Sequence, residues 1–123
     1  IPLRKTVEIY ALSQYFEKIN EDDLNKWEKC LDSMEIGCKE NDFYKIAEED
    51  INFHRIIVEQ SEINDVILIW KTLVNRIRGH FVRNYKKKYK NCMEIYYEHN
   101  AIFNMFKTGK KEMALKILES NIE

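Results

Sequence analysis

The sequence predicts an all-α protein folded as an antiparallel six-helix bundle. Only three glycines and one proline interrupt 123 residues, too few breakers for the many short strands and turns of an all-β protein. Hydrophobic residues make up 45% of the chain and include seven Tyr, six Phe and two Trp, which argues against intrinsic disorder. The length suits one domain with its own core, and several segments between breakers exceed the mean helix length of about 11–12 residues. Helices of such lengths build bundles.

Apolar spacing and a capping signal define the first two helices. We expect the first from Leu3 to Ile19, with apolar residues at near-helical spacing. Asn20 is an N-cap candidate, and the three acids after it suit the positive end of the next helix. That helix weakens at Gly37 and stops near residues 41–42, and its apolar stripe consists of Leu24, Trp27, Leu31 and Met34.

The same spacing predicts four further helices in the rest of the chain. The third covers Phe43–Gln60, and the fourth covers Val66–Arg78 with an extension through Gly79. The fifth holds Met93 to Phe106 and ends near Thr108-Gly109, and the sixth holds Met113 to Ile122.

The net charge of −1 gives no general sign of nucleic-acid or membrane binding, and no uncharged run is long enough to cross a membrane. Locally, the stretch from Arg83 to Lys90 is strongly basic and contains two tyrosines. It is either a solvated helix face or junction, which we favour because the run is short, or a phosphate-binding patch.

The three cysteines form no C-x-x-C pair, and an odd number does not make a disulfide framework. Cys30 and Cys38 are expected on one helix, about 12 Å apart along its axis, which is too far for a disulfide. We therefore expect small buried cysteines in a reducing compartment, which favours a cytoplasmic protein.

One pair of residues could begin a metal site. Asp50 and His54 are four positions apart, so their side chains share one face of the third helix and could grip a divalent metal together. An ordinary Asp/His pair is the alternative reading. His99 stands in an apolar helix, where a histidine is either a ligand or a hydrogen-bonded core residue.

Two arginines follow the apolar run of the fourth helix. Arg76 and Arg78 are two positions apart, so only one of them can face the bundle interior, where it would pair with an anion. The alternative is a salt bridge to an acid of the bundle. The chain contains no nucleophile motif, Gly-rich phosphate loop or Cys/His zinc pattern.

Several motifs in order along the chain resemble the FadR C-terminal (FCD) effector domain of GntR-family transcription regulators. The matching stretches are Arg4-x-x-Val7-Glu8, Asp50-Ile51-Asn52-Phe53-His54-Arg55, Leu73-x-x-Arg76-x-Arg78 and Glu98-His99-x-x-Ile102. The resemblance covers the whole chain, residues 1–123, as one ligand-sensing domain of the VanR-like six-helix type.

The resemblance implies a homodimer that senses a small carboxylate effector. DNA would be bound by an N-terminal winged helix-turn-helix domain that this chain does not contain, so we expect operator binding only through that domain. A palindromic operator would match the dimer.

The resemblance also implies a divalent metal, zinc or nickel, held by one Asp and three His. Residue by residue, the ligands would be Asp50, His54 and His99, but the position of the third histidine is Asn121. An amide oxygen is a poorer ligand than imidazole for these metals, so binding would be weakened or lost. Arg76 would pair with the effector carboxylate, with Arg4 as a second candidate.

Two other functions stay open, a helical-bundle metalloenzyme and a ligand-free interaction or dimerisation module. Di-iron bundles use Glu-x-x-His pairs on two helices, and this sequence contains no Glu-x-x-His. We therefore expect a sensor and not an enzyme.

Overall fold

The computed structural model describes residues 2–122 and confirms the all-α fold. These residues contain six α-helices, one 3₁₀ turn and no β-strand. The elements are α1 (Pro2–Tyr15), the 3₁₀ turn η1 (Phe16–Lys18), α2 (Glu21–Lys39), α3 (Phe43–Gln60), α4 (Asn64–Lys88), α5 (Met93–Lys107) and α6 (Lys111–Asn121).

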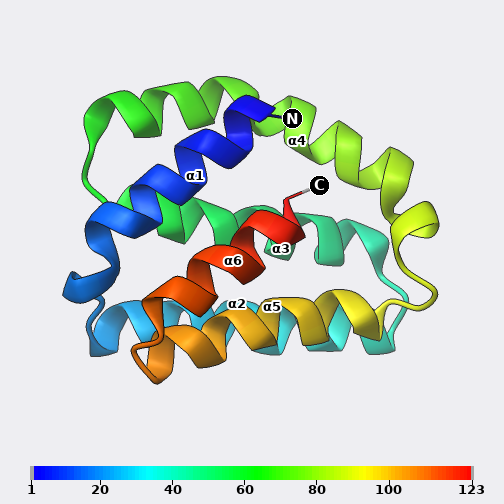
Figure 1. The fold of residues 1–123 in the computed structure, drawn as a ribbon. Coiled ribbons are helices and arrows are strands. Elements are labelled where there is room, and N and C mark those ends of the chain that lie inside the picture. Colours follow the sequence, from blue (N-terminus) through cyan, green and yellow to red (C-terminus); the bar gives the residue numbers. More distant parts are fainter. Residues whose placement is uncertain (1, 123) are drawn as a thin grey trace.

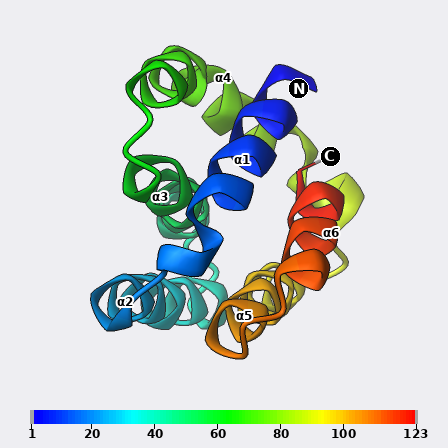
Figure 2. The same ribbon diagram turned by 60° about the vertical axis from the view of Figure 1, so that its left-hand side comes forward.

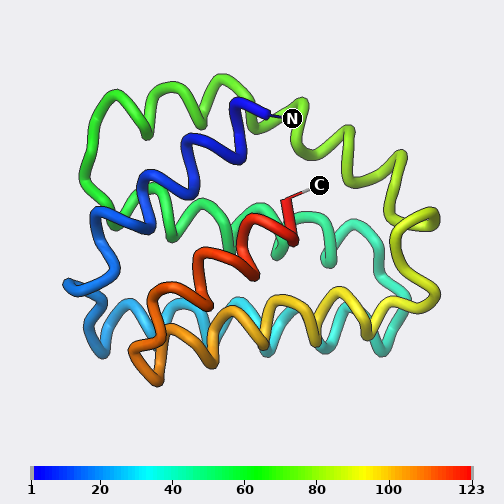
Figure 3. Tube along the Cα trace, viewed as in Figure 1, coloured from blue at the N-terminus to red at the C-terminus, as the bar shows by residue number. Residues whose placement is uncertain are grey.

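Consecutive helices run in opposite directions, as the tube in Figure 3 shows from end to end. The pairs α2·α3, α2·α5, α5·α6, α3·α4 and α1·α3 are in contact. In Figure 1, α2 and α5 form the lower layer, α4 arches over the top, and α3 runs through the middle. Turning the molecule shows α1 and α6 on one side of this arrangement, with α3 between α2 and α4 on the other (Figure 2). The central helix α3 therefore carries its buried side chains into contact with three other helices.

The start of α2 is set by local sequence. The Asn20 side chain accepts a hydrogen bond from the Asp23 backbone N–H at 2.9 Å, and the Asp23 carboxylate accepts one from the Asn20 N–H at 3.1 Å. This reciprocal pair satisfies two backbone donors that a helix start leaves without partners. The expected cap at Asn20 is confirmed.

Gly37 does not weaken α2, contrary to the sequence-based expectation. The helix runs through it to Lys39, and a Cβ atom at Gly37 would lie 3.2 Å from the Ile46 side chain of α3. The glycine therefore permits a close approach between α2 and α3 at the point where the chain turns back.

Two helix ends also differ from expectation. The first helix stops at Tyr15 and continues as the turn η1, and α4 extends ten residues past Arg78 to Lys88. The basic stretch Arg83–Lys90 is therefore the end of α4 and the start of the following loop, and most of its basic side chains are exposed.

Aromatic residues fill the end of the core near the turn between α5 and α6. Trp27 is completely buried, its indole N–H donates to the Phe53 carbonyl at 3.2 Å, and its ring centroid lies 4.5 Å from that of Phe106. The contact joins α2, α3 and α5.

No helix within residues 2–122 has the length and apolar character needed to cross a membrane.

Candidate metal centre

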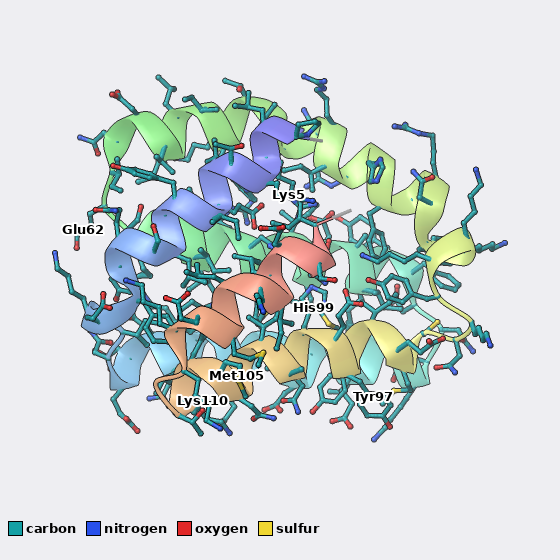
Figure 4. The ribbon with its side chains drawn as sticks, viewed as in Figure 1. Lys5, Glu62, Tyr97, His99, Met105 and Lys110 are labelled. Atoms are coloured by element: carbon teal, nitrogen blue, oxygen red, sulfur yellow. The ribbon has the colours of Figure 1, made fainter. Side chains whose placement is uncertain are left out.

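Asp50, His54 and His99 meet in the interior. One potential ligand atom from each lies within 4.8 Å of the other two, and all three side chains are buried. Asp50 and His54 lie one turn apart on α3, and His99 comes from α5. In Figure 4 the labelled His99 lies on the inner side of α5, facing α6, whereas Tyr97 lies on the outer side of the same helix. The structure thus brings together the three residues that the sequence analysis had singled out.

The hydrogen bonds of the two histidines fix which ring nitrogen faces Asp50. His99 Nδ1 lies 2.8 Å from the Ile95 carbonyl, which can only accept, so Nδ1 carries a proton. Its Nε2 lies 2.7 Å from Asp50 Oδ1. His54 donates from Nδ1 to the Glu8 carboxylate, and its Nε2 lies 3.6 Å from the same Asp50 oxygen. Both rings therefore turn Nε2 toward Asp50.

The charges around the cluster shift several pKa values. Burial by itself would raise the pKa of Glu8, but the neighbouring His54 and Arg4 lower it to about 2. Burial likewise opposes ionisation of Asp50, yet the neighbouring His54 and His99 rings hold its pKa well below the usual range. Burial would lower the pKa of His54, but Glu8 and Asp50 raise it to about 8. At neutral pH both carboxylates are ionised. In the absence of a metal, the His54 ring that lies between them is protonated on both nitrogens and positively charged.

Glu8 belongs to the candidate site, although the sequence analysis gave it no role there. Its completely buried carboxylate accepts hydrogen bonds from Arg4 Nε at 2.7 Å, from Trp70 Nε1 at 2.9 Å and from His54 Nδ1. The signal was present, because Arg4 and Glu8 are four positions apart on a helix and so can pair. Sequence spacing gives no sign of the two partners on other helices.

A cavity of about 50 Å³ adjoins the cluster. It can hold a few water molecules or a small polar group such as a carboxylate. Its walls include Arg4, Asp50, His80, Lys88, Tyr89 and Asn121. Four helices thus contribute to it, together with the residue that follows α4.

Asn121 lines this cavity and is 8% exposed. Its side-chain N–H donates to the Glu98 carboxylate, which also accepts from the Tyr89 hydroxyl at 2.9 Å. The backbone carbonyl of Asn121 accepts from Lys88 Nζ at 2.7 Å. Because the amide nitrogen is engaged with Glu98, the amide oxygen is the atom that Asn121 could offer to a cation.

The two effector candidates lie in different environments. Arg4 is 8% exposed and lines the cavity, whereas Arg76 is exposed on the outer side of α4 and does not line it. Ile77 occupies the inward position on α4, so the residue before it points away from the core. Arg78 forms a 2.6 Å ion pair with Glu48 of α3. The structure therefore places the second candidate, Arg4, beside Asp50, and leaves Arg76 on the surface.

Comparison with known proteins gives one match. The model of the FCD domain family matches residues 1–123, the whole chain. Searches of curated proteins and of solved structures found no match.

Proposed function

The chain belongs to the FCD domain family, and on that premise we propose that it is the effector-binding and dimerisation domain of a GntR-family transcription regulator. The observation that carries the proposal is the buried Asp50, His54 and His99 cluster next to a small cavity lined by several charged and polar residues. Such a site suits recognition of a small ligand. No catalytic role is proposed for these residues.

The donor set fits a divalent metal such as zinc or nickel. Asp50 would supply a carboxylate oxygen, and His54 and His99 would each supply Nε2. His54 Nε2 has no hydrogen-bond partner although it is buried, which is costly unless a bound ion satisfies it. Asn121 would be a weak fourth ligand through its amide oxygen, so we expect weaker binding than at a site with three histidines.

The effector would be a small carboxylate that enters the cavity. A bound metal would supply a Lewis-acid contact for one carboxylate oxygen. Arg4 is the better placed counter-charge, because its guanidinium is buried at the cavity wall and only Nε is committed to Glu8. Arg76 would act only through a ligand that extends to the surface of α4.

Regulation of operator binding would depend on how two copies of the chain assemble. In this proposal two copies form a homodimer in the cytoplasm, and operator DNA is bound by a separate winged helix-turn-helix domain on the N-terminal side of α1. Effector binding shifts operator affinity only if the effector prefers one arrangement of the dimer.

The test is a zinc and nickel titration of the metal-stripped protein by calorimetry. We expect the wild type to bind one ion per chain and His99→Ala to lose at least tenfold in affinity. His80→Ala is the matched control, since His80 lines the cavity but is not part of the cluster. Equal loss in both variants, or no binding by the wild type, would refute the metal site.

A further inference from the structure

The Glu8 carboxylate connects three helices at a single point. Its donors are Arg4 on α1, His54 on α3 and Trp70 on α4. Glu8 itself is on α1 and is completely buried. The Glu8 carboxylate accepts hydrogen bonds from the Arg4 guanidinium, the His54 imidazole and the Trp70 indole N–H. These three donors hold it in one orientation, because any other orientation would leave a buried donor without a partner.

We infer that Glu8 is the positioning residue of the metal centre: it orients the His54 ring so that Nε2 can bind the metal. The inference rests on the proposed metal site. By accepting from Nδ1, Glu8 keeps the proton on that nitrogen in the neutral ring, so the Nε2 lone pair faces Asp50. His54 Nε2 is the one buried side-chain nitrogen or oxygen within residues 2–122 that has no hydrogen-bond partner. A metal ion at the cluster would be that partner.

The two histidines depend on different supports. The orientation of His99 is set by the Ile95 carbonyl, which lies one turn earlier on the same helix. The His99 ring is therefore oriented whenever α5 is folded. His54 is oriented by a side chain 46 positions away in the sequence. His54 is therefore correctly oriented to bind the metal only when α1 is packed against α3 and α4.

This dependence links metal binding to the packing of α1. If docking of α1 raises metal affinity, then metal binding stabilises docking of α1 by the same factor. Because of the Glu8 contacts, the local unfolding of α1 should become rarer when a metal ion occupies the site.

Three proteins test the inference: the wild type, Glu8→Gln and Trp70→Phe. Glutamine matches the shape of glutamate but offers one acceptor oxygen to three donors. Trp70→Phe removes one donor to Glu8 and leaves the bond to His54 intact, so it is the matched control. Each protein is titrated with zinc by calorimetry after its helical content has been checked by circular dichroism.

We expect Glu8→Gln to bind zinc ten- to a hundredfold more weakly than the wild type, the usual cost of losing such a support. Trp70→Phe should change affinity less than about threefold on the same scale. Hydrogen exchange of the α1 amides in the wild type should slow when zinc is added, and this slowing should shrink in Glu8→Gln. Equal zinc affinity in Glu8→Gln and the wild type would overturn the inference.

A second measurement tests the orientation of His54 by Glu8 separately from the proposed metal site. It uses the wild type and so does not depend on whether a variant folds. Imidazole ¹⁵N shifts of the metal-free wild type at alkaline pH report the neutral tautomer directly. We expect His54 to carry its proton on Nδ1, and finding it on Nε2 would overturn the role of Glu8. If the wild type binds no zinc but His54 has the Nδ1–H tautomer, the metal site fails and the orientation of His54 by Glu8 stands.

Discussion

Asp50 on α3 and His99 on α5 are 49 positions apart in the chain, and their Oδ1 and Nε2 atoms lie 2.7 Å apart. Because His99 Nδ1 already donates to a backbone carbonyl, this contact is favourable only when Nε2 also carries a proton or when a cation is shared with the carboxylate. In the proposed metal site, a proton and a metal ion would therefore be alternative occupants of the space between these two atoms. Binding of the metal should therefore compete with protonation.

Asn121→His should strengthen zinc binding. An imidazole nitrogen is a better zinc ligand than an amide oxygen and would complete the donor set of one Asp and three His. We expect at least a tenfold gain, on the order of 1.4 kcal/mol, measured by competition with a chelator of known affinity. Asn121→Ala is the control and should lower affinity slightly. An unchanged affinity in Asn121→His would show that position 121 does not reach the ion.

Arg4→Lys should weaken binding of a small carboxylate far more than Arg76→Lys. Lysine keeps the charge but lacks the planar fork that pairs with both carboxylate oxygens. Of these two arginines, only Arg4 lines the cavity to which Asp50 also contributes. The measurement is the thermal shift of each protein with a panel of mono- and dicarboxylates of up to six carbons. A larger loss in Arg76→Lys would move the effector to the outer side of α4.

The metal-free protein should lose stability as the pH rises from 6 to 9. The pKa of His54 is raised to about 8 in the folded protein, from an ordinary value of 6.5, so its protonation favours folding. That stabilisation is fully present below about 6.5 and is lost as the pH rises through about 8. The loss should be on the order of 1–2 kcal/mol.

Urea unfolding in the presence of a chelator, at both pH values, measures this change. His54→Gln is the control, because it removes the titrating ring and should flatten the pH dependence over this interval. A wild-type stability that rises over the same interval would contradict the assigned charge on His54.

The three cysteines should react with an alkylating reagent in a fixed order. Cys92 is partly exposed and should be labelled first. Burial raises the pKa of the Cys38 thiol to about 11, and that of the buried Cys30 thiol still further, so both hold little thiolate at pH 8. Peptide mass spectrometry after timed labelling would show the order. Early labelling of Cys30 would mean that α2 opens away from α3.

The sequence by itself determined the helices, because the interactions that define them are local. The Asn20 capping signal and the apolar spacing both act within one or two turns, and both are found in the structure. The pairing of Asp50 with His54 on one face of α3 is also local, since four residues make about one turn. The meeting of these two with His99 followed only from the family resemblance.

Only the tertiary structure decided which polar residues are buried. Val66, Trp70, Leu73 and Ile77 define the inward face of α4, and Arg76 and Arg78 lie beside it. Arg78 is paired because Glu48 of α3 lies there, whereas the surface beside Arg76 is open. Glu8 is buried because His54, Arg4 and Trp70 supply three donors that offset its desolvation. Two of those donors come from other helices, so their approach depends on packing across the bundle and not on spacing along the chain.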